Sequence, residues 1–422
     1  MKYLPLPRLR DNIIRASQRL RIDRLSCASR LILLFAIVPL LNACGGGGGG
    51  TSSNSSETVS VSMSPAAQLG EQIFKDVSLS ASGKMSCATC HDPAHAHAQS
   101  NDLSVQLGGP NLDVPGFRAV PSLRYLNTTP AFFFDKEGTP TGGFNRDGRA
   151  QSLAEQAQRP FLAPHEMANE IAANVIDKLK KASYVETFRK VYGAGILDDA
   201  DTALNRVQQA LQAYQLEDSD FHPFDSKYDA FLAGKSSLTD SELRGLALFN
   251  NPTKGNCIGC HPSTKGSNGS PPLFTDFTYD NLGVPRNTTI AATADDSYFD
   301  LGLCGPDRTD LSSSAALCGA FKVPSLRNVA TRKVFFHNGR FTNLRDTLGF
   351  YVRRDTNPEE WYPLAADGTV LKFNDLPAQY QGNVNVTEVP YNRQRGGVAA
   401  LNATEIDDVI QFLNTLTDGY KP

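Results

Sequence analysis

The chain contains two Cys-x-x-Cys-His motifs. At this spacing, two thiols can form thioethers with the vinyl groups of a porphyrin, and on a helix the histidine lies on the same face as the first cysteine. Its imidazole can then be an axial ligand of the iron. A Cys/His zinc site or two unrelated thiol pairs are the alternatives. Two copies in an exported chain favour two covalently bound haem c groups, with four cysteines as attachment points and two histidines as axial ligands: Cys87, Cys90 and His91; Cys257, Cys260 and His261.

The N-terminal region is typical of an export signal. Seven arginines between Arg8 and Arg30 precede the apolar run 31–41, which is short for a membrane span. The run ends in Leu-Asn-Ala-Cys44, which resembles a bacterial lipobox and implies cleavage after residue 43 and lipid attachment to Cys44. Ordinary secretory cleavage nearby is the alternative. We therefore expect a lipoprotein signal peptide at 1–43, a Gly/Ser-rich tether at 44–64, and a periplasmic protein held to a membrane only through the lipid.

The net charge limits the class of binding partner, and the two remaining cysteines indicate a cross-linked loop. Without residues 1–43 the chain has 33 basic and 42 acidic residues, a net charge of -9, and no basic stripe for nucleic acid. This acidic balance could steer a cationic donor protein, although solubility explains it equally well. Cys304 and Cys318 bracket a Gly/Ser/Asp-rich loop, and outside the cytoplasm we expect a disulfide between them, with two free thiols as the alternative.

After residue 43, the same sequence features occur twice in the same order. A short helical pattern precedes each haem motif, Val-Pro-Ser-Leu-Arg follows it, and then come Asp-Gly-Arg149 or Asn-Gly-Arg340 and a further helix. This order predicts a mainly α fold of two cytochrome c-like haem domains related by internal duplication, with long loops. The predicted domains are 65–235 and 236–422. The expected helices cover 69–74, 152–158, 170–182, 203–214, 244–249, 343–350 and 402–416, those at 170–182 and 203–214 linking the halves.

The repeat also allows equivalent positions near the two haems to be compared. Eleven positions after Arg149 the chain has Pro160, and eleven positions after Arg340 it has Tyr351. Proline has no donor for iron, whereas a tyrosine oxygen is a possible axial ligand. We therefore expect one haem with an open distal side at Pro160 and one closed by Tyr351. A core aromatic in Gly-Phe-Tyr-Val is the alternative for Tyr351.

Taken together, these motifs resemble the bacterial di-haem cytochrome c peroxidase family, including its MauG-type branch, over residues 65–420. The resemblance is carried by the first haem motif, Asp-Gly-Arg-Ala-Gln-Ser-Leu-Ala-Glu-Gln-Ala at 147–157, Pro-His-Glu-Met at 164–167, Phe-Lys-Val-Pro-Ser-Leu-Arg-Asn at 321–328, and Phe-His-Asn-Gly-Arg at 336–340. It implies that hydrogen peroxide reacts at the N-terminal haem and that the C-terminal haem exchanges or stores electrons. Tyr351 matches the tyrosine ligand of MauG-type proteins.

The resemblance also assigns the distal residues. Glu166 matches the family's distal acid and Gln156 its distal amide; a carboxylate there can carry a proton between the two oxygens of peroxide. By itself, Glu166 would be a surface glutamate before a helix. The stretch 105–109, where many family peroxidases place a capping histidine, contains none. We therefore expect a five-coordinate N-terminal iron.

Two departures from the family pattern concern the space between the haems. Arg146 stands where the family usually has tryptophan, so electrons would pass through Phe144 or the propionates, and Arg146 is a candidate partner of a propionate. The family's calcium position corresponds to Ala119 and 332–334. There we expect Arg332 to supply the positive charge and calcium not to bind.

The sequence therefore predicts a periplasmic di-haem peroxidase that reduces hydrogen peroxide with electrons from a small donor protein, a cytochrome c or a cupredoxin. A MauG-type enzyme that oxidises Trp or Tyr residues of a partner protein is the alternative. A non-catalytic di-haem electron carrier is a third reading, and it requires six-coordinate iron in both domains. A haem-based sensor has no visible output domain.

Overall fold

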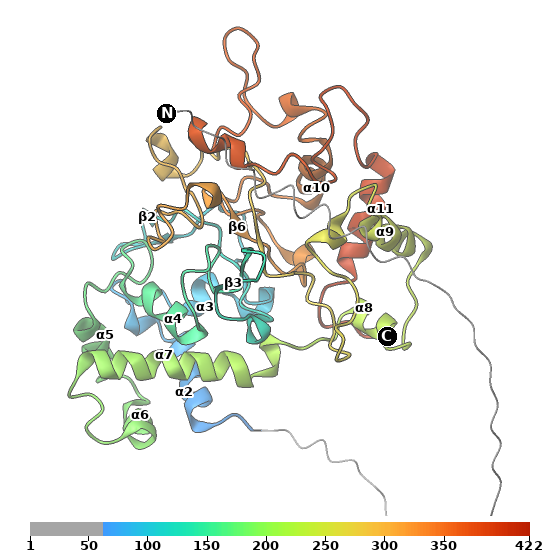
Figure 1. Cartoon of the computed structure of the whole chain (residues 1–422). Coiled ribbons are helices and arrows are strands. Elements are labelled where there is room, and N and C mark those ends of the chain that lie inside the picture. The colour runs from blue at the N-terminus through green and yellow to red at the C-terminus, as the bar shows by residue number, and fades with distance from the viewer. Residues whose placement is uncertain (1–61) are drawn as a thin grey trace, which may run out of the picture. The chain divides into compact units, whose positions relative to one another are not determined.

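The computed structural model describes residues 62–422 (Figure 1). The predicted signal peptide, Cys44 and all but the last three residues of the predicted tether lie outside these residues. Regular structure is mainly helical, with long loops between the elements. The α-helices are α2 (Pro65–Lys75), α3 (Cys87–Cys90), α4 (Leu153–Leu162), α5 (Ala172–Leu179), α6 (Val185–Tyr192), α7 (Ala200–Glu217), α8 (Lys227–Leu232), α9 (Asp240–Asn250), α10 (Leu344–Arg353) and α11 (Ala403–Asn414).

The strands are short and form three antiparallel pairs in the described part of the chain. The pairs are β1 (Leu107–Gly108) with β2 (Val114–Pro115), β3 (Phe133–Phe134) with β4 (Pro140–Thr141), and β5 (Tyr279–Asp280) with β6 (Phe321–Lys322). Within residues 62–422, no helix is both long and apolar enough to cross a membrane.

Polar caps fix where several of the predicted helices begin. Thr239 and Asn402 cap α9 and α11, each with a glutamate three residues later that completes a capping box. Ser152 and Asn343 accept hydrogen bonds from the third residues of α4 and α10. The two helices that carry Pro160 and Tyr351 therefore start in the same way.

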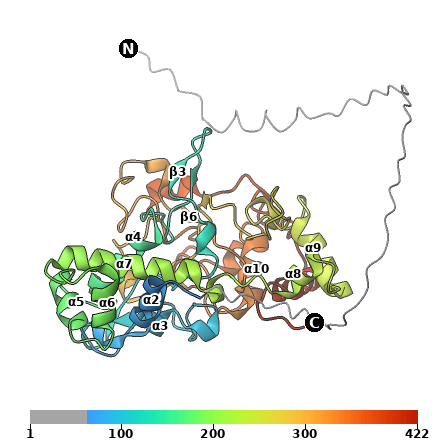
Figure 2. The same ribbon diagram turned by 90° about the horizontal axis from the view of Figure 1, so that it is seen from below.

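Two large hydrophobic cores, with a small cluster of Phe144, Ala150 and Leu153, hold residues 62–422 together. The first contains buried residues between Leu69 and Phe221, and the second contains buried residues between Tyr228 and Leu416. Helices α2 and α7 cross in the first core, and α9 and α11 cross in the second (Figures 1 and 2). Each crossing depends on a glycine. A Cβ on Gly70 would lie 2.0 Å from the Ala210 oxygen, and a Cβ on Gly245 would lie 2.0 Å from the Asp408 oxygen.

The structure corrects one packing expectation and adds two helices. Helices α5 and α7 do not link the halves, because α7 packs mainly on α2, α4 and α5 of the first core. Sequence patterns did not indicate α6 or α8. Tyr228 of α8 belongs to the second core, although the predicted boundary follows residue 235. Residues 62–422 cluster as one compact unit, so the two-domain division and its origin by duplication stay predictions.

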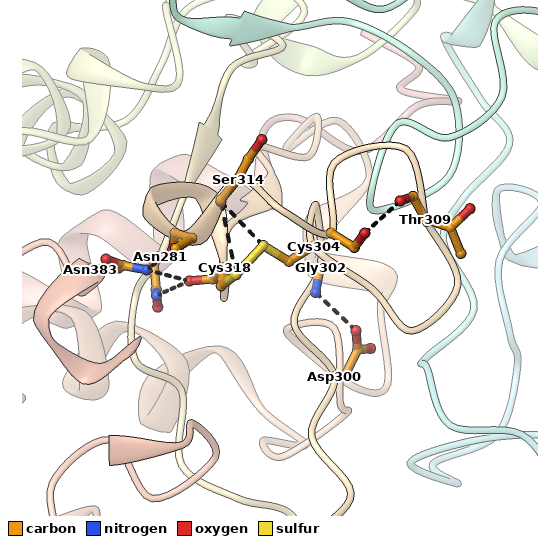
Figure 3. The surroundings of a disulfide bond; sticks show 10 residues. Asn281, Asp300, Gly302, Cys304, Thr309, Ser314, Cys318 and Asn383 are labelled. Carbon is orange, nitrogen blue, oxygen red and sulfur yellow. Dashed lines mark hydrogen bonds between the residues drawn. A yellow bond between two sulfur atoms is a disulfide. The ribbon is translucent and has the colours of Figure 1, made fainter. Parts of the chain in front are cut away.

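The expected disulfide is present. Cys304 and Cys318 are bonded, with an S–S distance of 2.09 Å, and both residues are buried (Figure 3).

Candidate haem sites and peroxide pocket

The first haem motif forms a short helix that presents its cysteines to a cavity. Ser86 caps α3 in a reciprocal arrangement with Thr89. The Nδ1 atom of His91 lies 3.2 Å from the His97 oxygen, so Nδ1 carries the proton and Nε2 is left as the metal-binding atom. Burial lowers the pKa of His91 to about 4, which keeps the imidazole neutral as an iron ligand requires.

The first cavity has a volume of about 190 Å³ and is bounded by Cys87, Cys90 and His91 on one side. Burial raises the pKa of both thiols to about 12. Within residues 62–422, no cluster of three His, Cys, Asp or Glu side chains is arranged for a metal ion. The thiols and the imidazole therefore fit haem c better than zinc.

Helix α4 and the turn that follows it also contribute residues to this cavity. Gln156 and Pro160 are one helical turn apart and both line the cavity. The chain then folds back, because the Met167 amide donates to the Pro160 oxygen at 3.0 Å. Strand β1 fixes this turn from outside. The Gly109 amide donates to the backbone carbonyl oxygen of Glu166 at 2.9 Å, and a Cβ on Gly108 would lie 2.3 Å from the backbone oxygen of His165.

Glu166 lines the same cavity as Gln156 and Pro160. Its side chain is 37% exposed. Burial raises the pKa of Glu166, and the nearby Arg159 and Arg149 partly oppose that rise. A carboxyl with a raised pKa can both accept and return a proton near neutral pH. His165 stacks on Phe117 and its Nε2 lies 3.6 Å from the Glu166 carboxylate.

A buried ionic network lies beside this pocket. The Arg118 guanidinium donates to both oxygens of Asp300, at 2.6 and 2.7 Å, and to Asp147 at 2.6 Å. Arg149 also donates to Asp147, at 2.6 Å. Asp300 comes from the second half of the chain, and these guanidiniums hold the pKa of Asp147 and Asp300 below the usual range despite their burial.

The second motif forms a 3₁₀ turn, Cys257–Gly259, at the edge of a larger cavity of about 520 Å³. His261 is 9% exposed, and its Nδ1 lies 2.7 Å from the Phe274 oxygen, so this histidine is oriented as His91 is. Burial raises the pKa of Cys257 and Cys260 to about 12. This cavity too fits a covalently attached porphyrin.

Tyr351 lines the second cavity from α10, together with Tyr391. The ring centroids of the two tyrosines are 6.3 Å apart, and Phe336 lies 5.5 Å from Tyr351 on another side. Burial raises the pKa of both hydroxyl groups. Tyr351 also packs against the second core, so a packing role and a ligand role use the same position.

Three half-buried cations line the cavities without a carboxylate hydrogen-bonded to them. Arg146 lines both cavities and donates to the Ala119 oxygen, Arg332 lines the second and donates to the Val120 oxygen, and Lys322 lines the second. Burial lowers the pKa of Arg146 to about 9, of Arg332 to about 10 and of Lys322 to about 8. Such cations call for anionic partners, and haem propionates are of that chemistry.

The candidate residues thus divide between two neighbouring cavities. Pro160 and Glu166 line the first, Tyr351 and Phe144 line the second, and Gln156 and Arg146 line both. Arg146 and Arg332 bond the backbone oxygens of 119 and 120, beside the position where calcium was not expected. Sequence reasoning missed three site residues: Lys322, Tyr391 and Asp307. Lys322 stands within a recognised motif, whereas nothing local to Asp307 or Tyr391 indicates a cavity.

Comparisons with known proteins agree with this geometry. The family model described as di-haem cytochrome c peroxidase matches residues 64–237. The chain is 36% identical to the methylamine utilization protein MauG of Paracoccus denitrificans, over 84% of this chain and 89% of that protein. The chain belongs to the di-haem cytochrome c peroxidase family. It is therefore a di-haem cytochrome c peroxidase-like oxidoreductase that acts on peroxide and carries two covalently bound haem c groups.

Two further proteins extend the comparison. The chain is 30% identical to cytochrome c551 peroxidase of Nitrosomonas europaea, over 70% of this chain and 76% of that protein. The crystal structure of the diheme peroxidase BthA from Burkholderia thailandensis matches with a TM-score of 0.77 and 38% identity, over 84% of this chain and 86% of that chain. The relatives thus include both peroxidases and MauG proteins.

Proposed function

We propose that this family member is an exported peroxidase that reduces hydrogen peroxide in the first cavity and takes the electrons through the haem of the second. The observation that carries the proposal is the contrast between the cavities. Glu166, Gln156 and Pro160, which has no ligating atom, all line the first cavity, whereas Tyr351 and the residues of the His261 motif line the second.

The protein groups of the first cavity suit the proton steps of the reaction. Glu166 accepts the proton of the inner peroxide oxygen and returns it to the outer oxygen, so that water can leave. Gln156 supplies an amide that orients the peroxide by hydrogen bonding. The bound haem supplies the iron and relays the electrons. Two electrons and two protons from outside the protein complete the conversion of one hydrogen peroxide into two waters.

Three parts of the proposal lie beyond the site itself. The electrons come from a small donor protein, a cytochrome c or a cupredoxin, and the acidic balance of the mature chain favours a basic one. The protein works in the periplasm, held to a membrane by lipid on Cys44. Arg146 and Arg332 hold propionates, and the wall at Phe144 and Arg146 separates the two haems.

A second candidate function uses the same two sites. Relatives named MauG, together with a tyrosine at position 351, favour oxidation of Trp or Tyr residues of a partner protein. Steady-state turnover of peroxide with reduced cytochrome c distinguishes the two functions. Rapid turnover supports the peroxidase, whereas very slow turnover with a long-lived oxidised protein supports partner oxidation.

The peroxide site is tested by Glu166→Gln. Because the amide cannot accept the proton, kcat/KM for peroxide should fall about 10²- to 10⁴-fold. The matched control is Glu170→Gln, four residues further on and exposed, which should leave kcat/KM unchanged. Equal rates for the wild type and Glu166→Gln would remove Glu166 from the reaction.

The ligand at the second site is tested by a pair of tyrosine variants. Tyr351→Phe should abolish the low-spin ferric signal of one haem in the electron paramagnetic resonance spectrum and leave the other haem unchanged. Tyr391→Phe is the control, since it alters the same cavity without removing the proposed ligand. A low-spin signal that survives Tyr351→Phe but disappears in Tyr391→Phe would assign the ligand to Tyr391 instead.

A further inference from the structure

The loop closed by the Cys304–Cys318 disulfide belongs to the second half of the chain but contributes a residue to the first cavity. Asp307, three residues after Cys304, lines the cavity that contains Glu166. Its side chain is 9% exposed. Strand β6 follows this loop, and both of its residues, Phe321 and Lys322, line the second cavity.

Asp307 is bonded to the arginines that face Glu166. One carboxylate oxygen accepts from Arg159 Nη2 at 2.5 Å, and the other lies 3.3 Å from Arg149 Nη1. Arg118 is 3.8 Å away. Arg159 is on α4, one residue before Pro160, so the Asp307 contact joins the loop to the helix that forms the distal side of the cavity.

The loop is held at both ends and near its tip. At one end the disulfide is buried, and the Cys318 oxygen accepts from the Nδ2 atoms of Asn281 and Asn383 at 3.2 and 3.1 Å (Figure 3). Next to Asp307, the Arg308 guanidinium donates to the backbone carbonyl oxygen of Asp147 at 2.9 Å. It also lies 3.8 Å from the centroid of the Phe132 ring. Asp307 is therefore presented in one fixed place.

We propose that Asp307 is a positioning residue of the peroxide site: it pairs with Arg159 and Arg149, and so keeps both guanidiniums from pairing with the Glu166 carboxylate. The disulfide-closed loop is the device that delivers this carboxylate from the second half of the chain. The inference rests on the proposed role of Glu166 as the proton carrier.

The charges around Glu166 explain the need for such a partner. Arg149 and Arg159 face it from the turn before α4 and from α4 itself, His165 precedes it, and Asp307 faces it from the loop. The thiols of the first haem motif also lie near, but they are uncharged once they are thioethers. The arginines lower the pKa of Glu166 and Asp307 raises it. Without Asp307, Arg159 would lose its carboxylate partner and Arg149 would keep only Asp147, so the two cations would stabilise the Glu166 carboxylate more strongly and draw it away from peroxide.

The test compares the pH dependence of kcat/KM for peroxide in the wild type, Asp307→Asn and Asp307→Glu. In Asp307→Asn the acid limb should move down by about one pH unit, and the plateau should fall at least tenfold. Asp307→Glu should restore most of the plateau, because it keeps the anion. Asp310→Asn is the matched control: it lies in the same loop, is exposed and pairs with Arg308 instead. It should show the wild-type profile.

A second variant tests the delivery by the loop. Cys304→Ser with Cys318→Ser should shift the acid limb in the same direction as Asp307→Asn, with both haem absorption spectra unchanged. An unshifted acid limb in Asp307→Asn, or an equal shift in Asp310→Asn, would overturn the proposal. If Glu166→Gln also kept full activity, the proposed function itself would fail; if only Glu166→Gln lost activity, the role of Asp307 alone would be rejected.

Discussion

The two cavities differ most in what surrounds them. The first is walled by charge, since Arg149, Arg159 and Asp307 lie around Glu166 and the pair of Arg118 with Asp147 lies beside them. The second also contains charged residues, Arg146, Arg332 and Lys322 among them, but aromatic rings surround its Tyr351, with Phe336 and Tyr391 as neighbours. A charged wall suits proton transfer to a small polar substrate, and an aromatic wall suits a centre that excludes water. The same attachment motif therefore supports two tasks because the opposite wall differs.

The largest effect should follow from breaking the charged wall. In Arg118→Met, the buried carboxylates of Asp147 and Asp300 lose their shared partner, so the free energy of unfolding should fall by about 3–5 kcal/mol at neutral pH. Urea unfolding of the haem-loaded protein measures this loss.

The pH dependence of that loss can be worked out from the pKa directions. Arg118 lowers the pKa of Asp147 and Asp300 in the folded state. Their contribution is present above the unfolded-state pKa, about 3.9, and is lost as pH falls through the lower folded-state pKa. The cost of Arg118→Met should therefore shrink below about pH 4. A cost that is equal at pH 3 and pH 7 would contradict this reading.

A smaller loss of stability tests a feature that the two halves share, a glycine at a helix crossing. Gly70→Ala and Gly245→Ala each place a Cβ against a backbone oxygen at a helix crossing, so each should lower the free energy of unfolding by about 1–3 kcal/mol. Gly382→Ala is the control, because nothing lies within 4 Å of its added Cβ, and it should change stability by less than about 0.5 kcal/mol. A loss at only one crossing would show that the halves do not share this constraint.

The smallest effect concerns the sign of a stability change. The folded protein raises the pKa of Glu166, mainly by burial, so the ionised carboxylate opposes folding above the unfolded-state pKa. Glu166→Gln should therefore raise the thermal midpoint at pH 7, and this gain should vanish as pH falls below the unfolded-state value of about 4.3. Calorimetry at pH 7 and pH 4 checks the sign, and a lower midpoint at pH 7 would contradict it.

Sequence patterns predicted what is local. The haem motifs, the capped helices that begin after Ser152 and Asn343, and the disulfide were all accessible, because each depends on residues near one another in the chain or on the chemistry of the cysteines. The resemblance to a family then indicated Glu166 and Gln156, and the structure places both in one cavity. Their roles, and that of Tyr351, stay predictions.

The rest depends on contacts between distant segments. Asp307 enters the first cavity because its loop packs against residues about 150 positions earlier, and nothing in Cys-Gly-Pro-Asp indicates Arg159 as its partner. Lys322 becomes a cavity cation only because β6 pairs with β5. Helices α5 and α7 were misplaced for the same reason, since an amphipathic pattern shows that a helix has a buried face but not which helix covers it.

The bidentate contact of Arg118 with Asp300 limits how the protein can be divided into separately expressed halves. Each ion belongs to a different half, and each is buried where water cannot solvate it once its counter-ion is removed. Separating the halves would break this contact and leave Asp300 without its guanidinium, so the halves are poor modules for shuffling or separate expression. New specificity is better grafted inside one half than obtained by exchanging halves between relatives.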